Sequence, residues 1–175
     1  MRQEFRGILL DQRGAAVILW SCFVVSIPIY IVIARRVLFD APLAGDAAFA
    51  AIARILLWIL TIVDLGYYIY WRKKRFNDPA ILREARSTKL FRALQEFSGA
   101  IEERAAYVVS TYVTRKVVLF AIIEAVAVYG LVAAVIGGFV ADQYFLSFLA
   151  VILLVLEFPS AKSFDRLMRA SEQSA

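Results

Sequence analysis

Residues 117–137 read VVLFAIIEAVAVYGLVAAVIG, an apolar run that contains one charged side chain, Glu124. A helix of this length crosses a hydrocarbon core of about 30 Å. Water solvates a carboxylate far better than lipid does, so Glu124 at this depth is costly unless it is protonated, paired or reached by water. The run therefore predicts a membrane-spanning helix with a functional residue inside it.

The composition of the whole chain points to the same class of protein. The 175 residues are 62% hydrophobic and 20% charged, and the charged residues cluster between the apolar runs. The net charge of +5 is therefore segregated beside apolar segments, as in multi-pass membrane proteins. We expect the lipid bilayer as a partner and no nucleic acid, because no basic face remains once the apolar runs are set aside.

Histidine is absent from the sequence, and Cys22 is the single cysteine. The lack of imidazole excludes histidine-ligated metal or haem and histidine-based acid–base catalysis. One cysteine excludes an internal disulfide, and a thiol in an apolar run usually behaves as a small hydrophobic group. We expect no metal, no cofactor and no enzymatic activity, since no paired nucleophile and base are visible.

Hydropathy predicts four membrane spans, and hence an all-α integral membrane fold. The spans are expected at about 14–34, 47–71, 117–140 and 143–158. The fourth is shorter than a typical span and needs local thinning of the bilayer or support from neighbours. The prediction is a four-helix transmembrane bundle with a helical cytoplasmic insertion between the second and third spans.

The distribution of lysine and arginine predicts the orientation of this bundle. The segment after the second span opens with Arg72-Lys73-Lys74-Arg75, and both ends of the chain are basic. The positive-inside rule then places both termini and the 72–116 segment in the cytoplasm, with the spans in the plasma (bacterial inner) membrane. Arg35 and Arg36 are the exception, because they fall on the outer side, where Asp40 and Asp46 are the acids expected to offset them.

Three regions follow from these borders: an N-terminal hairpin over 1–71, the insertion over 72–116 and a C-terminal hairpin over 117–175. The C-terminal region ends in an interfacial helix, since Phe164, Leu167 and Met168 share one face.

An apolar stripe at helical period runs through the insertion. Its members recur at spacings of three or four: Leu90, Leu94, Phe97, Ile101, Ala105, Val108 and Tyr112. One interpretation is a helix on the membrane or folded against its neighbour. The other is a partner interface, within a homo-oligomer or with another membrane subunit. Gly99 is expected to bend or break this helix; an unbroken helix into the third span would form a cytoplasmic stalk.

Ionisable residues also lie inside the second span, at Arg54 and Asp64. If the second and third spans are antiparallel, Asp64 and Glu124 lie at similar depth, and two such carboxylates would share one proton. The alternative is that Asp64 pairs with Arg72 or a nearby lysine, while a neutral Glu124 bonds a tyrosine or a backbone carbonyl. Arg54 either extends to the interface or pairs with Asp46 or Asp142.

The stretch Glu124-Ala-Val-Ala-Val-Tyr129-Gly130-Leu131 resembles the ion-binding helix of rotary ATPase c subunits, the proteolipids of the proton-driven ring. The resemblance covers about residues 117–138. It implies that Glu124 is a reversible proton carrier, with Tyr129 beside it. The partner helix of that family is rich in closely spaced glycines, whereas the second span here contains only Gly66.

Two functions remain open from the sequence. The first is a small non-catalytic accessory or scaffold subunit of a larger membrane complex, which fits the size and the amphipathic insertion. The second is a proton- or ion-translocating subunit that uses Glu124, with Asp64 as a possible second site. Small residues such as Ala133 and Gly137 in the third span allow close helix approach, so this helix is expected to be central or to face another subunit.

Overall fold

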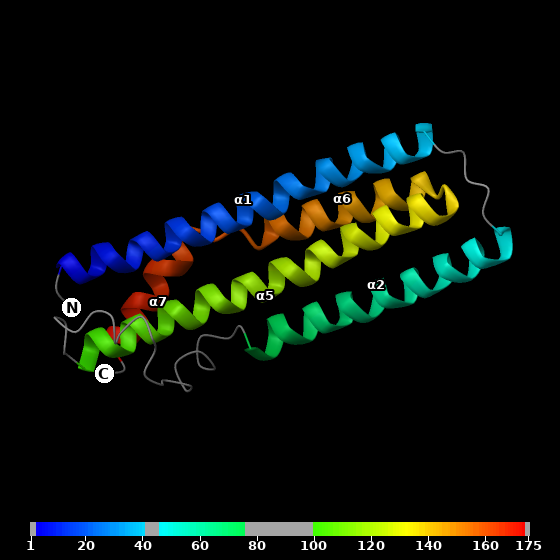
Figure 1. Cartoon of the computed structure of the whole chain (residues 1–175). Helices are drawn as coiled ribbons and strands as arrows, with labels where there is room; N and C mark the ends of the chain where they lie inside the picture. The colour runs from blue at the N-terminus through cyan, green and yellow to red at the C-terminus, as the bar shows by residue number, and fades with distance from the viewer. Residues whose placement is uncertain (1–2, 41–45, 76–99, 174–175) are drawn as a thin grey trace. The chain divides into compact units, whose positions relative to one another are not determined.

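The computed structural model describes residues 3–40, 46–75 and 100–173, and every element in them is an α-helix. Figure 1 shows these helices in chain order. Their bounds are α1 Gln3–Asp40, α2 Ala47–Arg75, α5 Ala100–Gly137, α6 Val140–Leu156 and α7 Ala161–Gln173. The all-helical expectation is thus confirmed for the part of the chain that the structure describes.

Three of these helices are long and apolar enough to cross a membrane. The qualifying segments are Asp11–Leu38 in α1, Ala47–Lys74 in α2 and Glu102–Gly137 in α5. A fourth arises if α6 and α7 are counted together, although the chain bends by 43° between them. The short fourth apolar run of the sequence is therefore the one whose length is marginal in the structure as well.

The chain divides into two compact units. The first unit comprises Met1–Trp20, Tyr70–Val118 and Phe158–Ala175, and the second comprises Ser21–Ile69 and Leu119–Glu157. The helices α1, α2 and α5 contribute to both units, whereas α6 belongs to the second and α7 to the first.

In the second unit, α5 and α6 form a central hairpin. Figure 1 shows the parts of α1 and α2 in this unit flanking that pair. On the α1 side, Phe23 contacts Phe120 of α5 with ring centroids 5.8 Å apart. On the α2 side, Trp58 contacts Phe145 of α6 at the same centroid distance of 5.8 Å. The flanking helices are consequently less buried: 44% of the most apolar window of α5 is buried, against 11% for each of α1 and α2.

Glycines set the geometry of the central hairpin. Gly138 has φ 68°, a left-handed conformation that glycine adopts without steric cost, and it ends α5 at Gly137. The third apolar helix therefore ends at Gly137, three residues before the border that the sequence predicted, and Val140 begins α6 instead. Further down the hairpin, a Cβ atom built on Gly130 would lie 3.1 Å from Cα of Gln143 and 3.2 Å from Cβ of Leu146. The backbones of α5 and α6 approach closely because residue 130 has no side chain.

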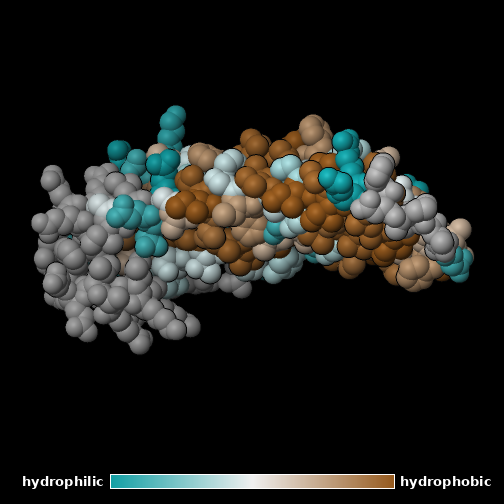
Figure 2. Space-filling model, turned by 45° about the horizontal axis from the view of Figure 1, so that its top comes forward, coloured by the Kyte–Doolittle hydropathy of each residue, from teal (hydrophilic) through white to brown (hydrophobic). Residues whose placement is uncertain are grey.

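The helix α2 carries its apolar residues on the outside. Exposed side chains at Ile52, Ile55, Ile59, Ile62 and Val63 are each at least half accessible. In contrast, Thr61 and Tyr68 are buried at 1% and 4% exposure. Figure 2 shows brown, apolar residues over much of one face of the described helices. A helix with this distribution reverses the pattern of a helix in water.

The helix α1 continues through Pro28 without ending. Proline has no N–H, so the carbonyl four residues earlier loses its usual donor. Nearby, the hydroxyl of Ser26 donates to the carbonyl of Phe23 at 2.8 Å. This bond is made one residue away from the carbonyl that Pro28 frees, which is that of Val24.

The first unit has its own small core. Buried residues from the start of α5, from α7 and Leu9 of α1 form one cluster, in which the ring of Tyr112 contacts that of Phe164 edge to face at 5.2 Å. Leu167 and Met168 of α7 are buried in the same cluster. The apolar face that the sequence assigned to an interfacial helix is thus covered by the chain itself. The helix α5 also runs unbroken from Ala100 to Gly137, while Gly99 lies outside the described residues. The cytoplasmic stalk that an unbroken helix would form stays a prediction.

We expect Gly130→Ala to lower the free energy of unfolding by about 1–3 kcal/mol, because the new Cβ would press on the backbone of α6. Thermal unfolding in detergent measures the effect. Gly66→Ala is the matched control, since a Cβ there meets nothing within 4 Å. Equal effects of the two substitutions would contradict the close approach of α5 and α6.

Candidate functional site

A polar stripe runs along the inner face of α2. It consists of Arg54, Trp58, Thr61, Asp64 and Tyr68, at spacings of four, three, three and four residues. This is the period of one helix face. Thr61 is satisfied within its own helix, because its hydroxyl donates to the carbonyl of Leu57 at 2.8 Å. The other four side chains each bond to a side chain of α5 or of the segment 140–157.

At the N-terminal end of the polar stripe, Arg54 forms an ion pair with Asp142. Its Nε lies 2.6 Å from Oδ2 of Asp142, and its Nη2 lies 2.9 Å from Oδ1. The indole N–H of Trp58 also donates to Oδ2, at 3.3 Å. The guanidinium further stacks over the ring of Phe139, with Cζ 4.6 Å from the ring centroid. The arginine side chain is 46% exposed and the aspartate 9%, so the pair neutralises an almost buried carboxylate.

Two tyrosine–carboxylate bonds occupy the rest of the stripe. The hydroxyl of Tyr129 on α5 donates to Oδ2 of Asp64 at 2.8 Å. The hydroxyl of Tyr68 donates to Oε1 of Glu157, also at 2.8 Å, and both of these side chains are buried. The tyrosine hydroxyl donates its proton to a carboxylate oxygen in both of these bonds. Asp64 is therefore joined to α5, and Tyr68 is joined to the residue that follows α6.

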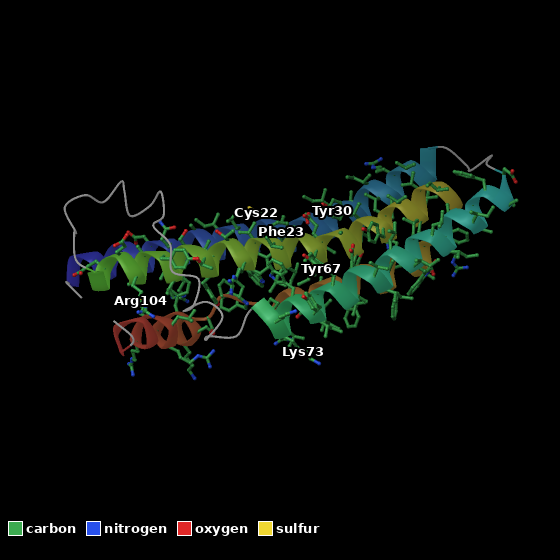
Figure 3. All side chains as sticks on the ribbon, turned by 90° about the horizontal axis from the view of Figure 1, so that it is seen from below. Cys22, Phe23, Tyr30, Tyr67, Lys73 and Arg104 are labelled. Carbon is green, nitrogen blue, oxygen red and sulfur yellow. The ribbon has the colours of Figure 1, made fainter. Side chains whose placement is uncertain are left out.

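Glu124 lies at a junction of three helices. The hydroxyl of Tyr30 on α1 donates to its Oε1 at 2.6 Å. The backbone carbonyl of the same Tyr30 accepts a bond from Nε2 of Gln143 on α6, at 3.0 Å. Figure 3 labels Tyr30 and Phe23 on α1, where this helix runs beside α5. One tyrosine thus connects α1 to both helices of the central hairpin.

The structure distributes the predicted site residues over separate contacts. Glu124 and Asp64 accept from two different tyrosines, Tyr30 and Tyr129, and Asp64 has a phenol as its partner where the sequence suggested a cation. Arg54 pairs with Asp142, one of its two suggested partners. The other, Asp46, accepts at Oδ1 from the N–H of Ala48 at 2.9 Å and so caps α2.

Sequence reasoning missed Tyr30, Trp58, Tyr68 and Gln143. Tyr30 is an isolated polar side chain within its apolar run, and Gln143 directly follows the charged Asp142. For Trp58 and Tyr68, the helical spacing to Arg54 and Asp64 is a usable signal.

Only part of the proposed partner interface can be placed. Leu90, Leu94 and Phe97 lie outside the described residues, as does the side chain of Ile101. Val108 and Tyr112 belong to the buried core of the first unit. In the described part of the chain, the apolar stripe of the insertion therefore packs within the protein. Its availability to a partner stays a prediction for residues 90–101.

The site offers carboxylates and phenols rather than a metal cage. Among the described residues, no three acidic or cysteine side chains are grouped to hold a metal ion. A carboxylate bonded by a phenol can exist neutral or ionised, and in either state it holds two helices together. The chemistry within reach is therefore helix association and proton binding.

No protein-family model, curated protein or solved structure matches this chain.

We expect Tyr68→Phe to reduce the free energy of unfolding by about 1–2 kcal/mol, because buried Glu157 loses a donor. Unfolding in detergent of Tyr68→Phe, Glu157→Gln and the double variant gives the coupling energy of the pair. Additive losses, with no coupling between the two positions, would show that this bond does not hold α2 in place.

Proposed function

We propose that this protein is a small multi-pass membrane protein with four spans, which serves as a non-catalytic accessory or scaffold subunit of a larger membrane complex. The observation that carries the proposal is the reversed arrangement of α2. Its apolar side chains face outward, and its polar stripe bonds to α5 and to the segment 140–157.

Lipid is the environment that makes this arrangement favourable. In water, exposed residues such as Ile55 and Ile62, at 61% and 65% accessibility, would leave apolar area unburied along the whole helix. In a bilayer the same side chains meet acyl chains, and polar groups must find their partners inside the protein. The Tyr30–Glu124, Tyr129–Asp64 and Arg54–Asp142 contacts are partners of this kind.

The accessory role is supported by what the polar side chains do. Four of the five side chains in the polar stripe, all but Thr61, bond to another segment of the second unit, as expected of groups that fix helix positions. The wide apolar faces of α1 and α2 leave room for neighbouring subunits. Under this proposal, both termini and residues 72–116 are cytoplasmic, in keeping with the lysine and arginine distribution.

Proton or ion translocation is the second candidate. The observation in its favour is the extent of the polar stripe: Arg54 and Tyr68 are fourteen residues apart, which corresponds to about 21 Å of helix. Carboxylates and phenols at intervals along such a path are the groups that relay protons in membrane proteins. Glu124 would then be the reversible carrier, as its resemblance to the c-subunit helix implies.

We expect Cys22 to resist a membrane-impermeant maleimide in open membrane sheets, although the structure leaves it exposed on α1. The reason is that a water-soluble reagent does not reach a thiol that faces hydrocarbon. Mass spectrometry of the labelled protein measures the reaction. Lys74→Cys in a Cys22→Ser background is the control, because Lys74 is exposed at the end of α2 and should react. Equal labelling at both positions would contradict the placement of α1 in lipid.

The two functions are separated by extraction into native-lipid nanodiscs followed by reconstitution. The accessory role predicts a stable assembly well above 19.7 kDa, and no proton or ion flux in proteoliposomes. It also predicts that Leu94→Glu with Ile101→Glu releases the partner while Glu124→Gln does not. The alternative predicts a flux that Glu124→Gln abolishes and that Asp11→Asn, at an exposed position of α1, leaves intact. A lone monomer without flux would contradict both.

A further inference from the structure

Arg35 and Arg36 have no role in the polar contacts described so far. They lie near the C-terminal end of α1, and both are exposed. The sequence suggested Asp40 and Asp46 as offsetting acids. Asp46 instead caps α2 through the N–H of Ala48, and the side chain of Asp40 lies outside the described residues. Two adjacent guanidinium groups at the end of an apolar helix therefore require another explanation.

Arg35 is held by Tyr144 of α6. Its Nε and Nη2 both donate to the tyrosine hydroxyl oxygen, at 2.9 and 2.6 Å, and Cζ lies 5.8 Å from the ring centroid. These bonds occupy one edge of the guanidinium, so its Nη1 nitrogen remains to meet a second acceptor. The hydroxyl of Tyr144 accepts both bonds and keeps its own proton to donate. Two donor groups at this position, Nη1 of Arg35 and the Tyr144 hydroxyl, thus suit an anion, and the tyrosine limits the freedom of Arg35.

Arg36 ends an exposed apolar stripe on α1. Val25, Ile29 and Val32 precede it at spacings of four, three and four residues, and these three side chains are 50–59% exposed. Residues so spaced lie on one face of a helix. From Val25 to Arg36 the stripe extends for about 16 Å, close to the depth of one leaflet of a hydrocarbon core of about 30 Å. An apolar stripe that ends in a cation matches an anionic phospholipid, which has an apolar acyl chain and a negatively charged head group.

We propose that Arg35, Arg36 and Tyr144 bind the phosphate of an anionic phospholipid, whose acyl chain lies along Val25, Ile29 and Val32. The inference rests on the membrane placement in the proposed function. Charge complementarity selects an anion, because guanidinium groups donate to phosphate in a bidentate manner. The apolar stripe selects a lipid over a free phosphate, since only a lipid also covers exposed Val25 and Ile29.

Lipid titration of the purified full-length chain in non-ionic detergent, read by native mass spectrometry, tests the proposal. The wild type should bind dioleoylphosphatidylglycerol more tightly than dioleoylphosphatidylcholine. Arg35→Gln with Arg36→Gln should weaken phosphatidylglycerol binding about 25-fold, since each basic residue near an anionic surface contributes about a fivefold factor. Tyr144→Phe should weaken it less, because Arg35 keeps its charge and loses only its fixed position. Lys73→Gln with Lys74→Gln removes the same charge elsewhere and should leave this binding unchanged.

Each remaining outcome overturns a defined part of the inference. Equal binding of the two lipids, or equal loss in the Lys73 and Lys74 control, would exclude a site at Arg35 and Arg36. Binding of glycerol 3-phosphate as tight as that of the lipid would replace the lipid with a free phosphate. If the double variant fails to fold, Arg36→Gln alone and Tyr144→Phe give the same comparison. Release of the wild type from membranes by alkaline carbonate would contradict the proposed function itself, whereas retention with no lipid preference would contradict the lipid site alone.

Discussion

A carboxylate placed among apolar helices must find its partner inside the molecule, and the arrangement of the second unit follows this constraint. Glu124 accepts from Tyr30, Asp64 from Tyr129, and Asp142 from Arg54 and Trp58. Every one of these bonds joins two helices that are distant in sequence. Dispersion forces between apolar side chains favour many rotations of a helix about its axis almost equally, whereas a buried polar bond favours few. The polar groups thus specify which faces meet.

The central position of the α5–α6 hairpin has a separate cause, which is the size of the side chains at its interface. Gly130 lets the backbone of α6 approach, and Ala127, Ala133 and Ala134 on the same helix are buried. Large residues meet instead between α1 and α5, as with Phe23 against Phe120. Close packing at the hairpin brings Gln143 of α6 within reach of Tyr30 on α1, so the small residues and the polar junction depend on each other.

Much of the helix content was predictable, and little of the pairing was. The length of the apolar runs predicts that the helices α1, α2 and α5 exist, because a span needs about 20 residues and few other structures tolerate such runs. The end of α5 was misplaced by three residues, since the conformation of Gly138 is a local property that hydropathy does not report. Glu124 was identifiable from its cost in lipid. Its partner was not, because an isolated tyrosine such as Tyr30 does not alter the hydropathy of its run, and the neighbour of each helix is decided by packing.

The order of residues along the chain gives the reversed α2 a consequence for biosynthesis. Arg54 and Asp64 leave the ribosome before Tyr129 and Asp142, which complete their contacts. Under the membrane placement proposed above, a nascent chain that stops after α2 would hold a guanidinium and a carboxylate among lipids, with neither partner yet translated. The second hairpin therefore supplies the partners that the polar stripe of the first lacks, and the order of synthesis makes the first hairpin dependent on the second.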